Sequence, residues 1–242
     1  MERLVSIIIP LYNYKDYIGD CIKSCLNQTY KNIEIILVDD NSTDGSYFEA
    51  QKFSEIKLFS PFTENRGVSS CRNYGIKMSR GEYIVHCDAD DLLTKDSIET
   101  RMRYFRKDTN LDLVHGLVWR LRLIDGKWQN DGYNEKAKIH GGSVMIKRSV
   151  YEKYGLFYER LRSKEDKEMW YRFGIHPISP LPKLVKSKKI NSFVACYRKH
   201  EKQKHRLRNG NESYNNEIEK IFWDRIKQLQ KEGITKENTK FL

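Results

Sequence analysis

Short apolar runs, rich in valine and isoleucine, alternate with stretches of helical periodicity over the first 110 residues of the chain. The apolar runs are each predicted to be a strand, at 5–9, 33–38, 56–59 and 83–87. Stretches with helical spacing follow them, at 16–28, from 42 or 43 to 54, at 67–78, and from 94 or 96 to 106. Because the strands are apolar on both faces, the pattern predicts a mostly parallel, Rossmann-like sheet with helices on each side.

The alternation stops after residue 110. Two further strands are predicted at 111–123 and 143–146, with a loop-like stretch at 125–142 between them. A short helix is predicted at 165–173. This part of the chain therefore reads as a small mixed β region with one helix.

Three prolines follow this helix and exclude regular structure nearby, at Pro177, Pro180 and Pro182. Helical spacing then returns in the apolar side chains Tyr214, Ile218, Ile221, Phe222, Ile226 and Leu229. We expect a C-terminal amphipathic helix folded back on the core. The chain thus divides into an α/β half at 1–110, the mixed β region at 111–182 and a C-terminal helical tail at 183–242.

Composition supports a globular chain, because 39% of the 242 residues are hydrophobic and 12% are aromatic. No run of 18 or more apolar residues is present, and the opening residues do not resemble a signal peptide. We therefore expect a cytoplasmic protein. The five cysteines form no Cys-x-x-Cys pair, which favours buried reduced thiols over disulfides or a zinc site.

The net charge of +11 is concentrated near the end of the chain. Residues 183–208 hold ten Lys or Arg against one acid, Glu201. Nucleic acid, an anionic membrane surface or a diphosphate-bearing substrate would each suit such a cluster. A solvated basic tail is an equal alternative.

Acidic residues gather where the predicted strands end. Parallel strands place their carboxyl ends, and their ligands, at one edge of the sheet. The polar residues found there are Tyr12 and Asn13, then Asp39 and Asp40, then Asp88, Asp90 and Asp91. Five carboxylates at one edge would repel one another, so a divalent cation is expected among them.

Turn formation or helix capping is the simpler explanation for Asp39 and Asp40 taken alone. It explains 88–91 less well, because three acids in four residues exceed what one turn needs.

Five stretches of the sequence together resemble the family 2 glycosyltransferases. They are VSIIIPLYN at 5–13, ILVDDNSTDG at 36–45, ENRGVSSCRN at 64–73, GEYIVHCDADD at 81–91 and SKEDKEMWYR at 163–172. The resemblance implies a GT-A fold and inverting transfer from a nucleotide-sugar donor, with a UDP-sugar favoured. It also makes 1–110 the donor-binding half and 111–182 the acceptor-binding and catalytic half.

The resemblance also implies roles for single residues at the donor end. Asp40 would bond the donor base, Tyr12 would lie against that base, and Pro10 begins the same loop. Arg72 would meet a phosphate or brace the acids; a structural salt bridge is the alternative. Asp88 would approach the ribose and a metal ion.

By the same resemblance, Asp90 ligates Mn²⁺ or Mg²⁺, which neutralises charge on the leaving nucleoside diphosphate. His200 is a further candidate ligand, and His205 is an alternative to it. A solvated basic segment is the simpler explanation for both histidines.

Asp166 would be the base that takes a proton from the acceptor hydroxyl. A helix-dipole position for Glu165 and Asp166 is compatible with that role. For Trp170, core packing is favoured over an acceptor platform.

The acceptor is expected to be a glycan, lipid-linked or protein-linked hydroxyl, since nothing in the stretch 117–140 identifies it. Two other functions fit the sequence less well. A nucleic-acid-binding protein is disfavoured because no binding motif accompanies the basic cluster. An oxidoreductase is disfavoured because no GxGxxG follows the first strand. The sequence leaves a homo-oligomer open.

Overall fold

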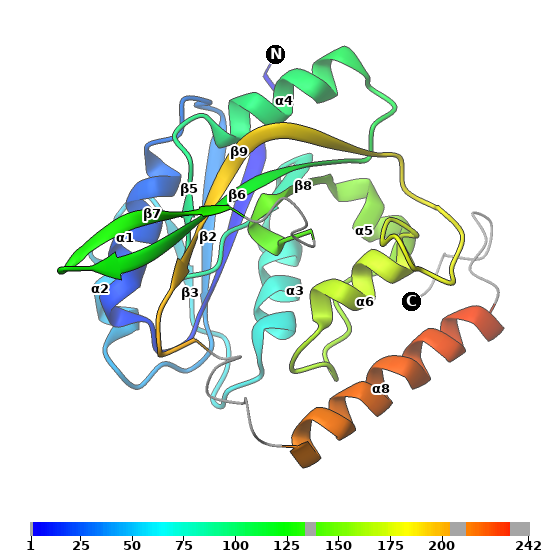
Figure 1. Ribbon diagram of the computed structural model, residues 1–242. Helices are drawn as coiled ribbons and strands as arrows, with labels where there is room; N and C mark the ends of the chain where they lie inside the picture. The colour runs from blue at the N-terminus through cyan, green and yellow to red at the C-terminus, as the bar shows by residue number, and fades with distance from the viewer. Residues whose placement is uncertain (1, 134–138, 204–211, 233–242) are drawn as a thin grey trace.

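The computed structural model of the protein describes residues 2–133, 139–203 and 212–232 (Figure 1). The helices are α1 Lys15–Leu26, α2 Ser46–Gln51, α3 Val68–Met78, α4 Ser97–Lys107, α5 Arg148–Tyr154, α6 Glu165–Arg172 and α8 Glu212–Lys231, with a 3₁₀ turn η1 at Gly141–Ser143. The strands are β1 Val5–Leu11, β2 Ile33–Asp39, β3 Lys57–Phe59, β4 Tyr83–His86, β5 Leu92–Leu93, β6 Leu113–Ile124, β7 Lys127–Tyr133, β8 Val144–Lys147 and β9 Ser187–Lys199.

One mixed sheet runs through the described part of the chain, in the order β3-β2-β1-β4-β8-β6-β9-β5, with β7 paired to β6. The first four strands along the chain are parallel to one another, as the alternating pattern predicts. β8 runs antiparallel to both β4 and β6, so it joins the parallel half to the mixed β region. The predicted α/β fold is confirmed.

Helices cover both faces of this sheet, and each face has its own core (Figure 1). The central strand β1 serves both, because Ile7 and Ile9 pack toward α1 and α4 while Ile8 packs toward α5, α6 and α8. The first core contains the apolar face of α1, formed by Ile18, Ile22 and Cys25. The strands are apolar on both faces for this reason.

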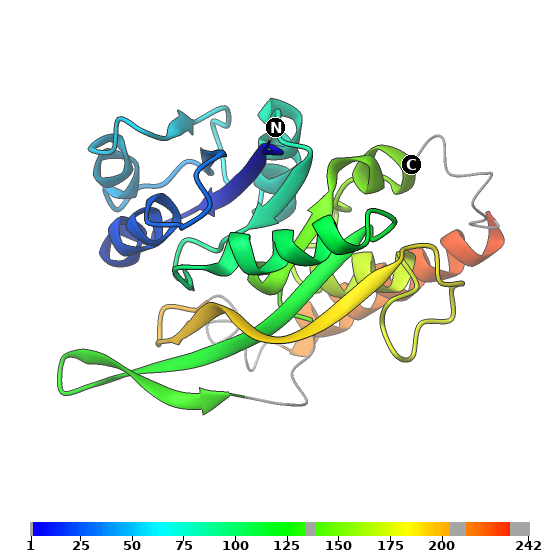
Figure 2. The ribbon, with the colours of Figure 1, turned by 90° about the horizontal axis from the view of Figure 1, so that it is seen from above.

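The sequence predicts a loop over 125–142, and that prediction is wrong for the first part of the stretch. β7 occupies Lys127–Tyr133 and forms an antiparallel hairpin with β6, turning at Asp125 and Gly126, both of which have positive φ. The hairpin projects away from the body of the molecule (Figure 2). β7 contains no β-branched residue and its side chains are mostly exposed, so its hydrophobic pattern is weak.

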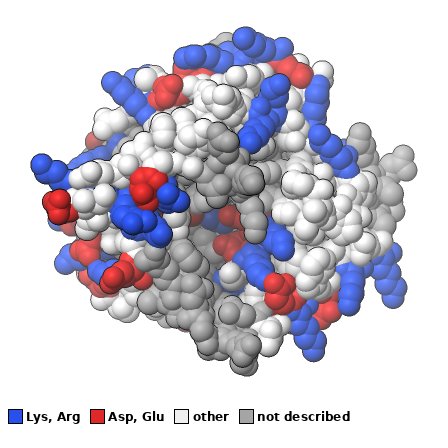
Figure 3. All heavy atoms as spheres, in the orientation of Figure 1, with Lys and Arg blue, Asp and Glu red and all other residues white. Residues whose placement is uncertain are grey.

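The basic stretch 183–208 is not a solvated tail over most of its described length. β9 occupies Ser187–Lys199 and lies between β6 and β5 in the sheet. Lys and Arg side chains are spread around the visible face rather than gathered in one patch (Figure 3). Outside the strand, Lys186 pairs with Asp108 and Lys202 pairs with Asp16. The basic residues in 204–208 lie outside the described residues.

The helix predicted to begin at Ser42 or Thr43 begins later, at Ser46. Asp44 is the reason: its Oδ1 accepts a hydrogen bond from the Ser46 amide and its Oδ2 accepts one from the Lys15 amide. Gly45 adopts a left-handed conformation just before the helix.

The C-terminal helix α8 lies where the sequence predicts it and packs with Ile218, Phe222, Ile226 and Leu229 against the second core. None of the described helices is both long and apolar enough to span a bilayer.

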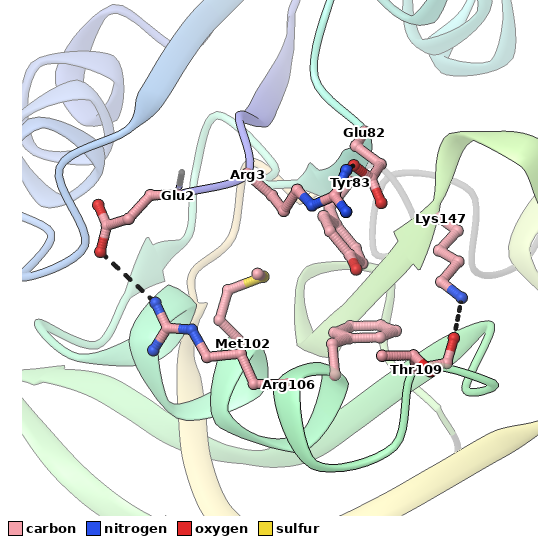
Figure 4. A pocket seen from close by; sticks show the side chains of 9 residues that line it. Glu2, Arg3, Glu82, Tyr83, Met102, Arg106, Thr109 and Lys147 are labelled. Carbon is pink, nitrogen blue, oxygen red and sulfur yellow. Dashed lines mark hydrogen bonds and ion pairs between the residues drawn. The ribbon is translucent and has the colours of Figure 1, made fainter.

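A cavity of about 680 Å³ opens at the amino-terminal edge of β1 and β4, away from the acidic residues at their carboxyl ends (Figure 4). Its charged groups are engaged with one another or with the backbone: Arg106 pairs with Glu2, Arg3 pairs with Glu82, and Lys147 donates to the Thr109 carbonyl. The cavity therefore does not coincide with the site predicted from the sequence.

Candidate active site

The acidic residues 88–91 follow β4 at the carboxyl edge of the parallel strands, as predicted. In Figure 3 acidic atoms lie recessed near the centre of the face, beside basic atoms. Asp90 is 8% exposed and Asp91 is 3% exposed. Burial, together with the nearby charges of Asp90 and Asp88, raises the pKa of Asp91 well above its ordinary value. A bound cation would stabilise these buried carboxylates by offsetting their mutual repulsion.

Arg72 connects the acidic residues after β4 to Asp166 on α6. It projects from α3 and is 2% exposed. Its Nη2 lies 2.7 Å from Asp88 Oδ1, and its Nη1 lies 2.8 Å from Asp166 Oδ1. The structural salt bridge considered in the sequence analysis is therefore present, and it involves two carboxylates that are far apart along the chain.

Asp166 lies in the first turn of α6, where the helix dipole favours an acid. Burial raises its pKa to about 6, against the lowering effect of Arg72. A carboxyl with that pKa is ionised at neutral pH and is a stronger base than an ordinary aspartate.

Gly141 allows Asp166 to approach closely. A side-chain carbon on Gly141 would lie 2.9 Å from Asp166 Oδ2 and 3.4 Å from Arg72 Nη2. A larger residue at this position would force the Asp166 carboxylate to shift. Gly141 lies in no motif of the sequence, and its pairing with Gly142 is the one local signal that could have marked it.

The Asp40 carboxylate accepts hydrogen bonds from a neighbouring loop, 65–67. Its two oxygens accept hydrogen bonds from the Arg66 amide, at 2.7 Å, the Gly67 amide, at 2.7 Å, and Asn65 Nδ2, at 2.8 Å. Asp39 accepts from the Ser42 amide at 3.1 Å. These two acids thus fix loops at the site's edge, as the turn-forming alternative supposed, and in the described residues neither is bonded to 88–91.

The remaining donor-side residues differ in exposure. Tyr12 is 42% exposed at the carboxyl edge of the sheet, so its ring is open to a ligand. Pro10 is buried within β1. Trp170 is 5% exposed and its Nε1 donates to the Ile139 carbonyl, which confirms the core-packing reading.

His200 is buried against the acids rather than solvated. It follows β9, is 8% exposed, and its Nε2 lies 3.1 Å from Asp90 Oδ2. The expectation that a histidine in this basic segment is solvated is wrong, because the segment is a strand of the sheet. His205, the alternative, lies outside the described residues.

A second histidine, His140, was not singled out from the sequence. Its side chain and those of Asp88 and Asp91 offer ligand atoms that all lie within 4.8 Å of one another. His140 precedes η1, and its Nε2 is 3.6 Å from Asp91 Oδ2. Two carboxylates and an imidazole form a donor set that Mn²⁺ accepts readily. Because His140 is far from the acids along the chain and lies in no motif, the sequence does not indicate that it joins them.

The family model for glycosyl transferase family 2 matches residues 6–169. An uncharacterised glycosyltransferase of Rickettsia typhi is 36% identical over 188 residues, covering 70% of this chain and 58% of that protein. Glycosyltransferase GlyA of Streptococcus pneumoniae is 40% identical over 158 residues, covering 63% of this chain and 22% of that protein. The chain thus spans less than two-thirds of the length of these relatives.

Solved structures share the fold at lower identity. S. aureus TarS in complex with UDP-GlcNAc has a TM-score of 0.66 at 19% identity, covering 82% of this chain and 59% of that chain. A mannosyltransferase from Pyrobaculum calidifontis, in complex with GDP-Man and Mn²⁺, has a TM-score of 0.64 at 20% identity, covering 86% and 60%. The fold is that of the GT-A glycosyltransferases. With the family model covering most of the chain, this protein belongs to glycosyl transferase family 2.

Proposed function

We propose that this chain transfers a sugar from a nucleotide-sugar donor to an acceptor hydroxyl, with inversion at the anomeric carbon. The observation that carries the proposal is the buried Arg72. It joins Asp88, in the acidic loop formed by residues 88–91, to Asp166 of α6. It brings a carboxylate suited to proton abstraction beside carboxylates suited to a metal-bound diphosphate. That pairing is what a single displacement at a sugar carbon requires.

At the donor end, Tyr12 is proposed to lie against the base, in the loop that begins at Pro10. Asp40, whose carboxylate holds the loop 65–67, is proposed to accept a hydrogen bond from the same base. A UDP-sugar is the favoured donor, supported by the TarS complex with UDP-GlcNAc; the mannosyltransferase complex with GDP-Man makes a guanine nucleotide the competing choice.

The acids are proposed to hold Mn²⁺ or Mg²⁺, with Asp88 and Asp90 joined by Asp91 and His140, or by His200. When bound, the ion would neutralise charge that builds on the leaving diphosphate. Asp91 supports this assignment, because its burial among like charges is costly without a cation.

At the acceptor end, Asp166 is proposed to take the proton from the attacking hydroxyl. Arg72 keeps its carboxylate oriented and ionised through the 2.8 Å contact. The acceptor is proposed to be a glycan, lipid-linked or protein-linked hydroxyl. Peripheral contact with an anionic membrane is a further proposal, supported by exposed lysines on β9 such as Lys188 and Lys189.

Two substitutions separate the two ends of the site. Mn²⁺ with UDP should raise the melting temperature of the wild-type protein, and Asp90→Ala should abolish that rise, because it removes a ligand. Asp166→Asn should keep the rise but lose sugar transfer by about a hundredfold or more, as expected for the loss of a general base.

The matched control is Asp224→Ala, which removes an exposed acid on α8 and should change neither property. If Asp90→Ala shows the full wild-type rise, the metal assignment is wrong. If Asp166→Asn transfers sugar at the wild-type rate, Asp166 is not the base.

A further inference from the structure

The orientation of His200 is not explained by hydrogen bonds alone. Its Nε2 lies 3.1 Å from Asp90 Oδ2, but its buried Nδ1 has no hydrogen-bond partner among the described residues. Histidines at metal sites are usually oriented by a hydrogen bond to the second ring nitrogen. A contact other than a hydrogen bond must therefore fix the orientation of the His200 imidazole.

Two tyrosines at the start of α1 supply that contact. The ring of Tyr17 is stacked on the imidazole of His200, with 4.2 Å between centroids and 23° between planes. Tyr14 meets the same imidazole edge-on, at 5.9 Å and 88°. One ring restricts the tilt of the imidazole, and the other restricts its rotation in the plane of the stack.

Tyr17 is fixed in turn by Arg198, which is fully buried two residues before His200. Arg198 Nη2 donates to the Tyr17 carbonyl at 3.0 Å, and its guanidinium lies 5.2 Å from the centre of the Tyr17 ring. Trp128 of the projecting hairpin packs on the same guanidinium, at 5.6 Å. The stack is thus assembled from α1, β7 and the end of β9.

The same end of β9 also holds the acidic loop. Arg198 Nε donates to the main-chain carbonyl of Asp90 at 2.5 Å, and its amide donates to Asp91 Oδ1 at 2.9 Å. Together with the contact from His200, these bonds tie 90–91 to β9. A shift of His200 would therefore change the positions of Asp90 and Asp91.

We propose that Tyr17 is a positioning residue for the acidic loop. By stacking on His200 it keeps the imidazole against Asp90, and so keeps 88–91 in the geometry that takes up a divalent cation. Tyr17 acts through His200. The part of this inference that concerns a cation rests on the proposed function.

Mn²⁺ affinity in the presence of UDP tests the inference, measured on the whole chain by electron paramagnetic resonance of the free ion. Tyr17→Ala should weaken Mn²⁺ binding about tenfold, the lower end of what losing an outer-shell partner costs. Tyr17→Phe retains the ring and should bind as the wild type does. Tyr47→Ala, which removes a tyrosine on α2, is the control for loss of an aromatic side chain.

All four proteins are compared at a temperature well below their melting points, so that a loss of stability is not read as a loss of affinity. Wild-type affinity in Tyr17→Ala would overturn the inference. So would a Tyr17→Phe variant as weak as Tyr17→Ala, since the hydroxyl and not the stacked ring would then matter.

A metal-free measurement makes the inference independent of the proposed function. The Asp91 amide donates to the Asp88 carbonyl at 2.9 Å, so its hydrogen exchange reports the order of the acidic loop. Tyr17→Ala should speed exchange at Asp91 about tenfold and leave Val85, inside β4, unchanged. Should wild-type protein bind no Mn²⁺, the metal assignment fails, and the exchange rate alone decides the role of Tyr17. An Asp91 amide that exchanges at the wild-type rate in Tyr17→Ala overturns it.

Discussion

At the scale of single residues, Arg72 connects the acidic loop to the proposed base Asp166. Its motif is compatible with a phosphate contact, with bracing of the acids and with a structural salt bridge. The structure shows it buried between Asp88 and Asp166. A buried guanidinium needs anionic partners, and partners this distant along the chain can be identified only once the chain is folded. Gly141 and His140 were missed for the same reason.

Asp166 gives a pH dependence that can be measured. Its pKa is raised to about 6, and only the ionised carboxylate accepts a proton. Transfer should therefore be constant above pH 7 and fall as the pH drops through about 6, by up to tenfold per unit. The measurement is kcat with a nucleotide-sugar donor from pH 5 to pH 8, after confirming that the protein stays folded throughout. A rate that does not change between pH 5 and pH 7 would contradict the assignment.

At the scale of elements, β9 and β7 were missed while the first four strands were found. The early strands are buried on both faces, so nearly every residue is apolar. β9 instead carries lysines on its exposed side and contains Arg198 near its end, where α1 and the acidic loop satisfy the charge of the guanidinium. The sequence of such a strand cannot be distinguished from that of a basic tail until its neighbouring strands are known.

The junction of α5 and α6 gives a prediction about stability. Arg172, 2% exposed on α6, donates to the carbonyls of Tyr154, Gly155 and Leu156 at the end of α5, and it pairs with the fully buried Glu168. Arg172→Leu would leave a buried carboxylate and helix-end carbonyls poorly partnered. We expect the free energy of unfolding to fall by about 3–5 kcal/mol, measured by urea denaturation.

The control is Arg103→Leu on α4, because Arg103 is 61% exposed and its ion pair with Glu99 is at the surface. That change should cost less than about 1 kcal/mol. An equal cost for the two substitutions would contradict the importance assigned to the buried pair.

At the scale of the whole molecule, the sheet separates two cores, and α8 closes the second one. Its apolar face meets α6 and the residues around it, although the two helices are far apart in sequence (Figure 1). The C-terminal helix is thus part of the folded unit that carries Asp166.

Phe222, fully buried in that core, tests the contribution of α8. Phe222→Ala should lower the free energy of unfolding by about 3–5 kcal/mol, because it removes a large side chain and leaves a cavity. Urea denaturation measures the change. Lys227→Ala, on the exposed side of the same helix, should stay within about 0.5 kcal/mol. A small effect for Phe222→Ala would mean that α8 is only loosely packed.

The amino-acid sequence was enough to predict the parallel half of the sheet, the C-terminal helix, the acids 88–91 and the family to which the chain is similar. Each of these depends on local periodicity or on a short motif, and both can be recognised along the chain. The folded chain was needed to show that Arg72 bridges Asp88 and Asp166, that β9 is a strand, and that His140 and His200 flank the acids. These features depend on contacts between distant segments, whose burial and pairing are set by the fold as a whole.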